Sequence, residues 1–239
     1  MNNTFHDINA NDSNNSLNHE GCITCLNWRM YNHLGSIHNS SNTLYILRHG
    51  HSEANEQRLI VSDIKNGITN YGLSAKGIQE IKDSIYRLIT ATHTESEYII
   101  YSSPFLRTVQ TSLLVAEIIL AQEIYYDSRL RERFFGEWEL TENINYQKVW
   151  LEDYQNPCHK KWCVESTYEV LERVTSAVRE IDSLYKGKQI IFVTHGDVAQ
   201  ILISGYLNQN PQSHRQLSSI ETGELKVLHQ PIGKIKSDC

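Results

Sequence analysis

Two histidines in this chain follow apolar, strand-like runs and could carry phosphoryl chemistry. His49 comes after residues 44–47 with Arg48 directly before it, and His195 comes after residues 190–194; each histidine precedes a glycine. In open α/β sheets, ligands bind outside the carboxyl ends of the strands, so we expect both histidines to reach one pocket. An arginine offers a planar fork of donors that matches phosphate oxygens, and a neutral imidazole offers a ring nitrogen that can attack phosphorus. The two strand ends therefore predict a site for a phosphoryl group.

The elements that must position these residues alternate between strand and helix patterns from residue 43 onward. Short apolar runs predict strands, and amphipathic stretches with capping residues such as Ser166 and Glu169 predict helices. Residues 140–164 are expected to begin as a helix and to loop around Pro157. This order predicts an α/β fold, a three-layer α/β/α sandwich with a mostly parallel central sheet. The expected strands cover residues 43–47, 98–101, 124–126, 189–194 and 224–228, and the expected helices cover 74–89, 103–121, 166–187 and 197–207.

The composition predicts one domain that follows a polar leader. The chain has 239 residues and a formal net charge of -6, so we expect no basic surface for a nucleic acid. No apolar run is long enough to cross a membrane and no secretory signal pattern begins the chain, which favours a cytoplasmic protein. Residues 1–42 are rich in Asn and Ser and predict a disordered leader, in which Met30 could be an alternative translation start. Residues 43–232 predict the domain, and residues 233–239 a tail.

A second kind of site is conceivable within the leader. Cys22 and Cys25 have the spacing of a metal or redox pair, and His19, His33 and His38 lie nearby in the sequence. A zinc site needs four well-placed ligands, and a thioredoxin-like site needs a βαβ context. The segment shows neither signature, so an unstructured segment is the favoured interpretation, with no metal and no cofactor.

Five short sequence blocks follow one another in a fixed order along the domain. In this order they resemble the histidine phosphatase superfamily, also called the phosphoglycerate mutase-like family, over most of residues 44–200. The resemblance implies a phosphoglycerate mutase-like fold and a histidine acid-type phosphatase, which hydrolyses small phosphorylated metabolites through a phosphohistidine. The blocks are RHGHSEAN at 48–55, LSAKGIQ at 73–79, SSPFLRTVQT at 102–111, LRERFFG at 130–136 and THG at 194–196.

The resemblance also implies roles for single residues. His49 corresponds to the nucleophile, and Arg48, Arg107 and His195 correspond to the phosphate clamp. We expect Arg107 in the first turn of a helix that Ser103 and Pro104 open, where backbone N–H groups favour an anion. Asn55 corresponds to a residue that contacts phosphate, although a cap for the following turn is an alternative, and Ser52 is equally open.

Glu132 corresponds to the proton donor for the leaving oxygen. A carboxyl group must be protonated to do this, and burial beside a phosphate would raise its pKa. The alternative is a solvated Glu132 whose neighbours Arg131 and Arg133 lower its pKa instead.

Three departures from the family pattern bear on activity and substrate. Leu140 and Val164 stand where the family commonly has glycine, and residues 140–164 lack the long basic insertion of the cofactor-dependent mutases. A phosphomonoester hydrolase is therefore favoured, with a mutase-type phosphotransferase as the alternative. A binding module without turnover is a third candidate, against which the presence of Glu132 argues. The expected partner is a small phosphorylated substrate, and a homodimer is a possible assembly.

Overall fold

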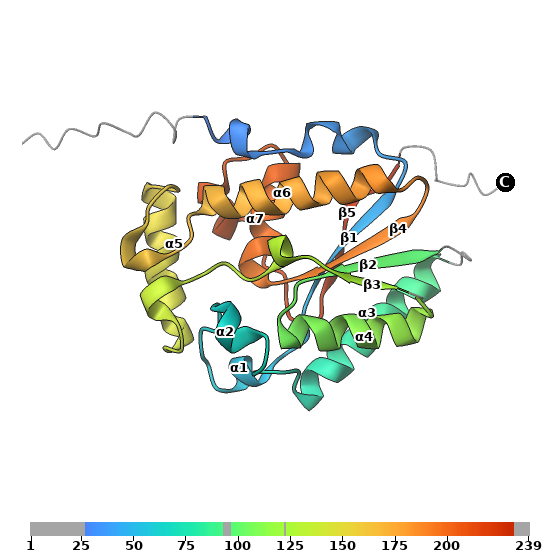
Figure 1. The fold of residues 1–239 in the computed structure, drawn as a ribbon, viewed down its shortest axis with the longest axis horizontal. Coiled ribbons are helices and arrows are strands. Elements are labelled where there is room, and N and C mark those ends of the chain that lie inside the picture. Colours follow the sequence, from blue (N-terminus) through green and yellow to red (C-terminus); the bar gives the residue numbers. More distant parts are fainter. Residues whose placement is uncertain (1–26, 93–96, 122, 232–239) are drawn as a thin grey trace, which may run out of the picture.

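A five-stranded sheet forms the centre of the molecule (Figure 1). The computed structural model describes residues 27–92, 97–121 and 123–231. Within this part of the chain the strand order is β3-β2-β4-β1-β5, and β5 alone pairs antiparallel to its neighbour. The sheet is therefore mostly parallel, as predicted. The strands are β1 (Thr43–Arg48), β2 (Tyr98–Ser102), β3 (Ile124–Tyr126), β4 (Gln189–Thr194) and β5 (Leu225–His229).

Helices cover both faces of this sheet. In Figure 1, α6 and α7 lie on one side of the strands and α3 and α4 lie on the other. The predicted three-layer sandwich is therefore confirmed, and the helices match the predicted segments to within a few residues. Their bounds are α3 (Ala75–Thr92), α4 (Leu106–Ile119), α6 (Thr167–Leu184) and α7 (Gly196–Tyr206).

Side chains of β1 alternate between two buried clusters, because successive residues of a strand point to opposite faces. Leu44 and Ile46 join the cluster beneath α6 and α7. Tyr45 and Leu47 join the cluster that contacts α3. Both faces of the central strands are buried, which explains why their sequences read as continuous apolar runs.

Side-chain caps fix where two of the long helices begin. Ser166 and Glu169 form the predicted capping box at α6, and the Gly77 amide donates to the Ser74 hydroxyl at α3. The predicted cap of α4 is wrong, because α4 begins at Leu106 and has Phe105 as its N-cap without a side-chain bond. The Ser103 hydroxyl is instead committed to a histidine of the site described below.

Residues 27–42 correct the expected extent of the disordered leader. They form two 3-10 turns, η2 (Trp28–Tyr31) and η3 (Leu34–Asn39). Trp28, Leu34 and Ile37 are buried in the cluster beneath α6 and α7. These few apolar residues lie among many Asn, Ser and His residues, which makes the sequence signal for this packing weak. Residues 1–26 and 232–239 lie outside the described residues.

Short elements gather at the carboxyl ends of the parallel strands. Between β1 and α3, the chain forms two single-turn helices, α1 (Glu53–Glu56) and α2 (Ile64–Gly67). Residues 140–164 begin, as predicted, with a helix, α5 (Tyr146–Gln155). The remaining 3-10 turns are η4 (Ser128–Leu130), η5 (Gly136–Trp138), η6 (Asn143–Asn145), η7 (Lys161–Cys163) and η8 (Pro211–Gln216).

Leu140 and Val164, which stand where the family commonly has glycine, differ in backbone conformation. Leu140 keeps a left-handed backbone with φ of 58°, a conformation that a side chain disfavours. Val164 has an extended backbone, and its side chain is buried with Ile60, Phe135 and Val149 in a small cluster near α5. A glycine at position 164 would forfeit that packing.

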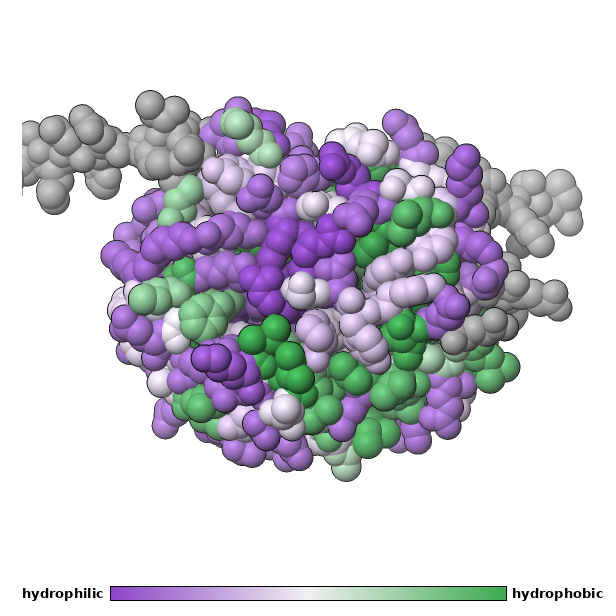
Figure 2. All heavy atoms as spheres, viewed as in Figure 1, coloured by the Kyte–Doolittle hydropathy of each residue, from purple (hydrophilic) through white to green (hydrophobic). Residues whose placement is uncertain are grey.

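No helix among the described residues is suited to crossing a membrane. None of the helices in the described residues combines the length and the apolar character that a span requires. On the face shown in Figure 2, hydrophobic residues gather over α4, and hydrophilic residues cover much of the remainder.

Candidate active site

The register between β1 and β4 places the two predicted histidines side by side. Arg48 pairs with Thr194 at the ends of these parallel strands, and the next residues are His49 and His195. The backbone amide of His49 donates to the Thr194 carbonyl at 3.0 Å. The imidazole centroids lie 5.2 Å apart. The two strand ends therefore converge on one site, as the sequence predicted.

The hydrogen bonds of His49 identify which of its two ring nitrogens carries the proton. Its Nδ1 lies 2.8 Å from the carbonyl oxygen of Gly50. Because a carbonyl only accepts, Nδ1 carries the proton and Nε2 keeps its lone pair. Burial lowers the pKa of His49 well below its usual value, and the charges of Arg107 and Arg48 lower it further. The ring is thus neutral and nucleophilic at Nε2 around pH 7.

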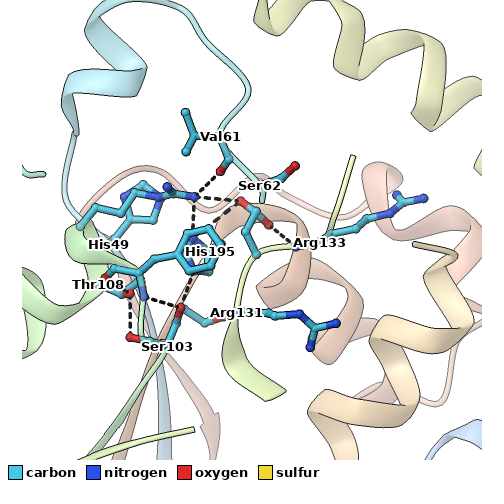
Figure 3. Close-up of polar contacts among 12 residues, drawn as sticks. His49, Val61, Ser62, Ser103, Thr108, Arg131, Arg133 and His195 are labelled. Atoms are coloured by element: carbon cyan, nitrogen blue, oxygen red, sulfur yellow. Dashed lines mark hydrogen bonds and ion pairs between the residues drawn. The ribbon is translucent and has the colours of Figure 1, made fainter. Parts of the chain in front are cut away.

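Arg107 connects both imidazoles from the first turn of α4. Its Nε donates to Nε2 of His49 at 3.1 Å, and its Nη2 lies 3.0 Å from Nδ1 of His195. The same Nη2 donates to the carbonyl of Val61 at 2.9 Å. Figure 3 shows His49, Val61 and His195 gathered around one point from separate elements. The guanidinium is buried, so its charge acts in a medium that screens it less than water does.

His195 lies beneath Arg107 and is fully buried. Its Nε2 is 2.8 Å from the hydroxyl of Ser103, which follows β2. Burial is the main cause that lowers the pKa of His195, followed by the charge of Arg107. In this structure the ring therefore contacts the site as a neutral group.

Two buried N–H donors of the site have no hydrogen-bond partner among the described residues: Nε of Arg48 and Nη1 of Arg107. Nη1 of Arg48 is bonded to the Ile220 carbonyl at 2.7 Å, which fixes the guanidinium in place. A buried donor without a partner costs about 1–3 kcal/mol, so such groups call for a ligand or a water. Both donors belong to residues that line one cavity with His49, and an anion there would satisfy them.

Glu132 presents its carboxyl group to the same cavity. Its Oε1 accepts from the Arg133 backbone amide at 2.9 Å, and its Oε2 lies 3.8 Å from both Arg107 Nη2 and His195 Nδ1. Burial raises the pKa of Glu132 to about 7, outweighing the opposite effect of Arg107. The group can therefore exist in either protonation state near neutral pH, as an acid and base must.

The family profile of the histidine phosphatase superfamily (branch 1) matches residues 44–235. The chain belongs to the histidine phosphatase superfamily. The match covers all of the described sheet except Thr43, and every residue of the site named above. The resemblance expected from the five sequence blocks is thereby confirmed.

Known relatives in the superfamily have phosphatase-type and mutase-type names. A Hydrogenobacter thermophilus protein, provisionally named phosphoserine phosphatase 2, is 29% identical over 168 residues, 67% of this chain and 76% of its own. Phosphoglycerate mutase-like protein 4 of Arabidopsis thaliana is 25% identical over 165 residues, 66% of this chain and 68% of its own. These names support a phosphatase- or mutase-type enzyme of the histidine phosphatase superfamily.

The solved structures confirm the fold. The YhfR protein of Bacillus stearothermophilus superimposes with a TM-score of 0.63 at 24% identity, covering 78% of this chain and 90% of that one. The histidine phosphatase fold is thus shared over most of both chains.

The alternative of a solvated Glu132 beside two charged arginines is wrong, because Glu132 is buried and both arginines pair with other carboxylates. In Figure 3, Arg131 and Arg133 point away from the two labelled histidines. Nη2 of Arg131 pairs with Glu165 at 3.0 Å. Arg133 is fully buried and pairs with both carboxylate oxygens of Asp153, at 2.6 and 2.7 Å. Neither guanidinium is therefore available to keep Glu132 ionised.

Asn55 has the structural role that was its alternative, and it also lines the cavity. Its Oδ1 accepts from the backbone amide and the hydroxyl of Ser52, each at 3.0 Å, in a capping box at α1. Both residues belong to the cavity wall. With Oδ1 committed to the cap, the amide nitrogen of Asn55 is the atom that could contact a ligand.

The sequence analysis did not identify the part of the cavity wall that α5, α7 and η8 form. Trp150 of α5 stacks on Tyr146 with centroids 5.3 Å apart, and the Arg215 guanidinium lies 3.7 Å from the Trp150 ring centroid. Asp197 of α7 accepts from the Trp150 indole at 2.9 Å and from Arg133 at 3.1 Å. Helical spacing of Tyr146 and Trp150 was the available signal, but it does not show which face of the helix meets the site. The cavity has a volume of about 290 Å³ and is lined by Arg48, His49, Ser52, Ala54, Asn55, Leu59, Val61, Arg107, Glu132, Phe135, Asn143, Tyr146, Trp150, Gly196, Asp197, Arg215, Ser219 and Glu221.

The metal alternative finds no support in the part of the chain that is described. No three His, Cys, Asp or Glu side chains there are grouped as metal ligands would be. His19, Cys22 and Cys25 lie outside the described residues. His38 packs against Tyr206, with ring centroids 4.7 Å apart.

Proposed function

We propose that this protein is a phosphomonoester hydrolase that acts on a small phosphorylated metabolite through a phosphohistidine at His49. One observation supports this proposal most strongly. An unprotonated Nε2 of His49 lines the same cavity as the unpartnered N–H donors of Arg48 and Arg107. A phosphoryl group there would meet a nucleophile on one side and satisfy both donors. Buried donors of this kind are unusual unless a ligand completes them.

In the first half of the reaction, Nε2 of His49 attacks phosphorus as the bond to the leaving oxygen breaks. The carboxyl proton of Glu132 passes to that oxygen, and an alcohol departs. In the second half, Glu132 takes a proton from water, the resulting hydroxyl attacks phosphorus, and the P–N bond breaks. His49 and Glu132 then return to their starting states, and inorganic phosphate is released.

The cationic groups stabilise the charge that spreads over the phosphoryl oxygens in the transition state. Arg48 and Arg107 keep fixed charges in a buried site, where reorganisation on reaction is small. We propose His195 as a further donor to the phosphate and the Asn55 amide as a peripheral one. No step uses a metal ion, so a chelator is expected to leave the rate unchanged, and a metal requirement would contradict this scheme.

The alternative is a mutase, which must return the phosphoryl group to the same substrate before water enters. The Arabidopsis relative named phosphoglycerate mutase-like supports keeping this candidate. Release of inorganic phosphate without a bisphosphate primer would favour the hydrolase. Rapid interconversion of phosphoglycerates with little hydrolysis would favour the mutase.

The experiment that tests the hydrolase compares wild type and His49→Ala over a panel of phosphomonoesters, by measuring phosphate release. We expect His49→Ala to lose at least about 10³-fold in kcat, because the nucleophile has no substitute. His38→Ala is a matched control, since His38 is exposed and lies outside the cavity. Unchanged turnover in His49→Ala would refute the proposal.

A further inference from the structure

The hydrogen bonds around His195 leave at least one donor without an acceptor, whichever ring tautomer is chosen. Nδ1 of His195 faces Nη2 of Arg107 at 3.0 Å, and Nε2 faces the hydroxyl of Ser103 at 2.8 Å. Arginine can only donate, whereas a serine hydroxyl can donate or accept. The protons of His195, Ser103 and Arg107 can therefore be arranged in two ways, and each way satisfies a different set of hydrogen bonds.

With the proton on Nε2, His195 accepts from Arg107 and donates to Ser103. The Ser103 oxygen also accepts from the Phe105 amide at 3.4 Å. The hydroxyl proton of Ser103 then has no acceptor among the hydrogen bonds of the described residues, although Ser103 is fully buried. This arrangement leaves one donor unused.

With the proton on Nδ1, the Ser103 hydroxyl donates to Nε2 and its bonding is complete. The Nδ1 proton then points at the Arg107 guanidinium, a second donor, and needs another acceptor. Oε2 of Glu132 is 3.8 Å from Nδ1, beyond hydrogen-bond reach. A phosphate oxygen between Arg107 and His195 would accept from both and remove the conflict.

We propose that Ser103 is a positioning residue that lets His195 change tautomer when a phosphoryl group binds, so that a neutral ring turns from an acceptor for Arg107 into a donor to phosphate. The Nε2 proton is released to water and Nδ1 takes one proton from water, while the Ser103 hydroxyl reverses from acceptor to donor. The ring keeps one proton throughout, so binding at this residue requires no net proton uptake. This inference rests on the anion site of the proposed function and adds how one member of that site is prepared.

Nitrogen NMR of the full chain labelled with ¹⁵N-histidine, titrated with inorganic phosphate, tests the proposal directly. The His195 signals are assigned by their loss in His195→Gln. We expect a protonated-type Nε2 and an unprotonated-type Nδ1 in the free protein, and the reverse at saturating phosphate. The same tautomer in both states, or two protonated nitrogens in the complex, would overturn the proposal.

Phosphate affinity of Ser103→Ala provides a second test, with Ser102→Ala as the matched control. Ser102 is equally buried, but its hydroxyl donates to the carbonyls of Ser103 and Thr108 and not to His195. Loss of the bond gained on binding should raise the dissociation constant of Ser103→Ala about tenfold, against a change within about twofold for Ser102→Ala. Equal affinities for Ser103→Ala and wild type would contradict the role of Ser103.

The two tests separate this inference from the proposed function. A tautomer change on phosphate binding without any ester hydrolysis would support the inference and count against the hydrolase. Hydrolysis that depends on His49, with an unchanged His195 tautomer, would support the hydrolase and overturn the inference. No phosphate binding at all would count against both.

Discussion

The rings of His49 and His195 lie 5.2 Å apart, centroid to centroid, at an interplanar angle of 63°. The residues are 146 positions apart in sequence, and the pairing of β1 with β4 brings them together. Each presents a different nitrogen to Arg107, Nε2 from His49 and Nδ1 from His195. A single guanidinium therefore fixes the spacing of the proposed nucleophile and the proposed phosphate donor.

Glu132→Gln should slow the hydrolysis of alkyl phosphates far more than that of aryl phosphates. A poor leaving group needs the proton that Glu132 supplies, so we expect kcat to fall about 10²–10³-fold for an alkyl ester and less than about tenfold for 4-nitrophenyl phosphate. Steady-state kinetics on the two esters measures this. Glu172→Gln, an exposed change on α6, is the control. Equal losses on both esters would argue against a proton donor.

In the proposed mechanism, the pKa of Glu132 sets the alkaline limit of activity. Burial raises this pKa to about 7, so the acid form that protonates the leaving group is lost as the pH rises through that value. The pKa of His49 lies well below its usual value, so the nucleophile stays unprotonated under mildly acidic conditions. The kcat profile for an alkyl ester should therefore fall about tenfold per pH unit above about pH 7. A flat profile from pH 6 to 9 would contradict this assignment.

The raised pKa of Glu132 also predicts that Glu132→Gln gains stability over wild type as the pH rises. Because the folded pKa is raised, the favourable contribution of protonated Glu132 is complete below its unfolded pKa and is lost as the pH rises through about 7. Glu132→Gln should match wild type near pH 5 and exceed it at pH 8 by on the order of 2 kcal/mol in the free energy of unfolding. Denaturant titrations at the two pH values measure this. A difference that is the same at both would show that Glu132 does not titrate as described.

Arg107→Lys should lose activity although the charge is retained. The guanidinium contacts His49 through Nε and both Val61 and His195 through Nη2, an arrangement that a single ammonium cannot reproduce. We expect kcat/KM to fall by about 10² and inhibition by inorganic phosphate to weaken. Arg179→Lys, on the exposed face of α6, is the matched control. Activity close to wild type in Arg107→Lys would show that only the charge matters.

Leu140→Gly should be tolerated despite the loss of a large apolar side chain. Leu140 has φ of 58° and is 45% exposed, so glycine removes backbone strain of about 1–2 kcal/mol at a modest cost in buried area and chain entropy. We expect the free energy of unfolding to stay the same or to rise by up to about 1 kcal/mol. Leu151→Gly, an exposed change inside α5, should lower it by about 1 kcal/mol. Similar losses in both variants would contradict the strain at Leu140.

The sequence predicted the parts of this molecule that depend on local pattern. Apolar runs and capping residues identified the strands and long helices, and parallel strand ends brought His49 and His195 together. It could not predict where Arg131 and Arg133 point, because their partners Glu165 and Asp153 lie 34 and 20 residues away in the chain. The environment of Glu132 depends on where these two side chains point. Only the structure could show that its carboxyl group is buried and paired with neither arginine.

The role of Ser103 was hidden for a similar reason. In the sequence, Ser103 before Pro104 has the pattern of a helix cap, and nothing local connects it to His195. The connection arises because β2 and β4 are neighbours, so that the residues after both strands meet. The pairing of these strands thus places the Ser103 hydroxyl in the site. Helix α4 begins two residues after Pro104 and is not capped by this hydroxyl.

The most direct measurement of the central claim is the location of the phosphoryl group on the enzyme during turnover. Rapid quenching under alkaline denaturing conditions, followed by peptide mass spectrometry, should find phosphate on His49, and nitrogen NMR should place it on Nε2. The signal should appear before phosphate release and be absent from His49→Ala. Phosphate on any other residue, or single-turnover hydrolysis with no phosphoenzyme, would contradict the account.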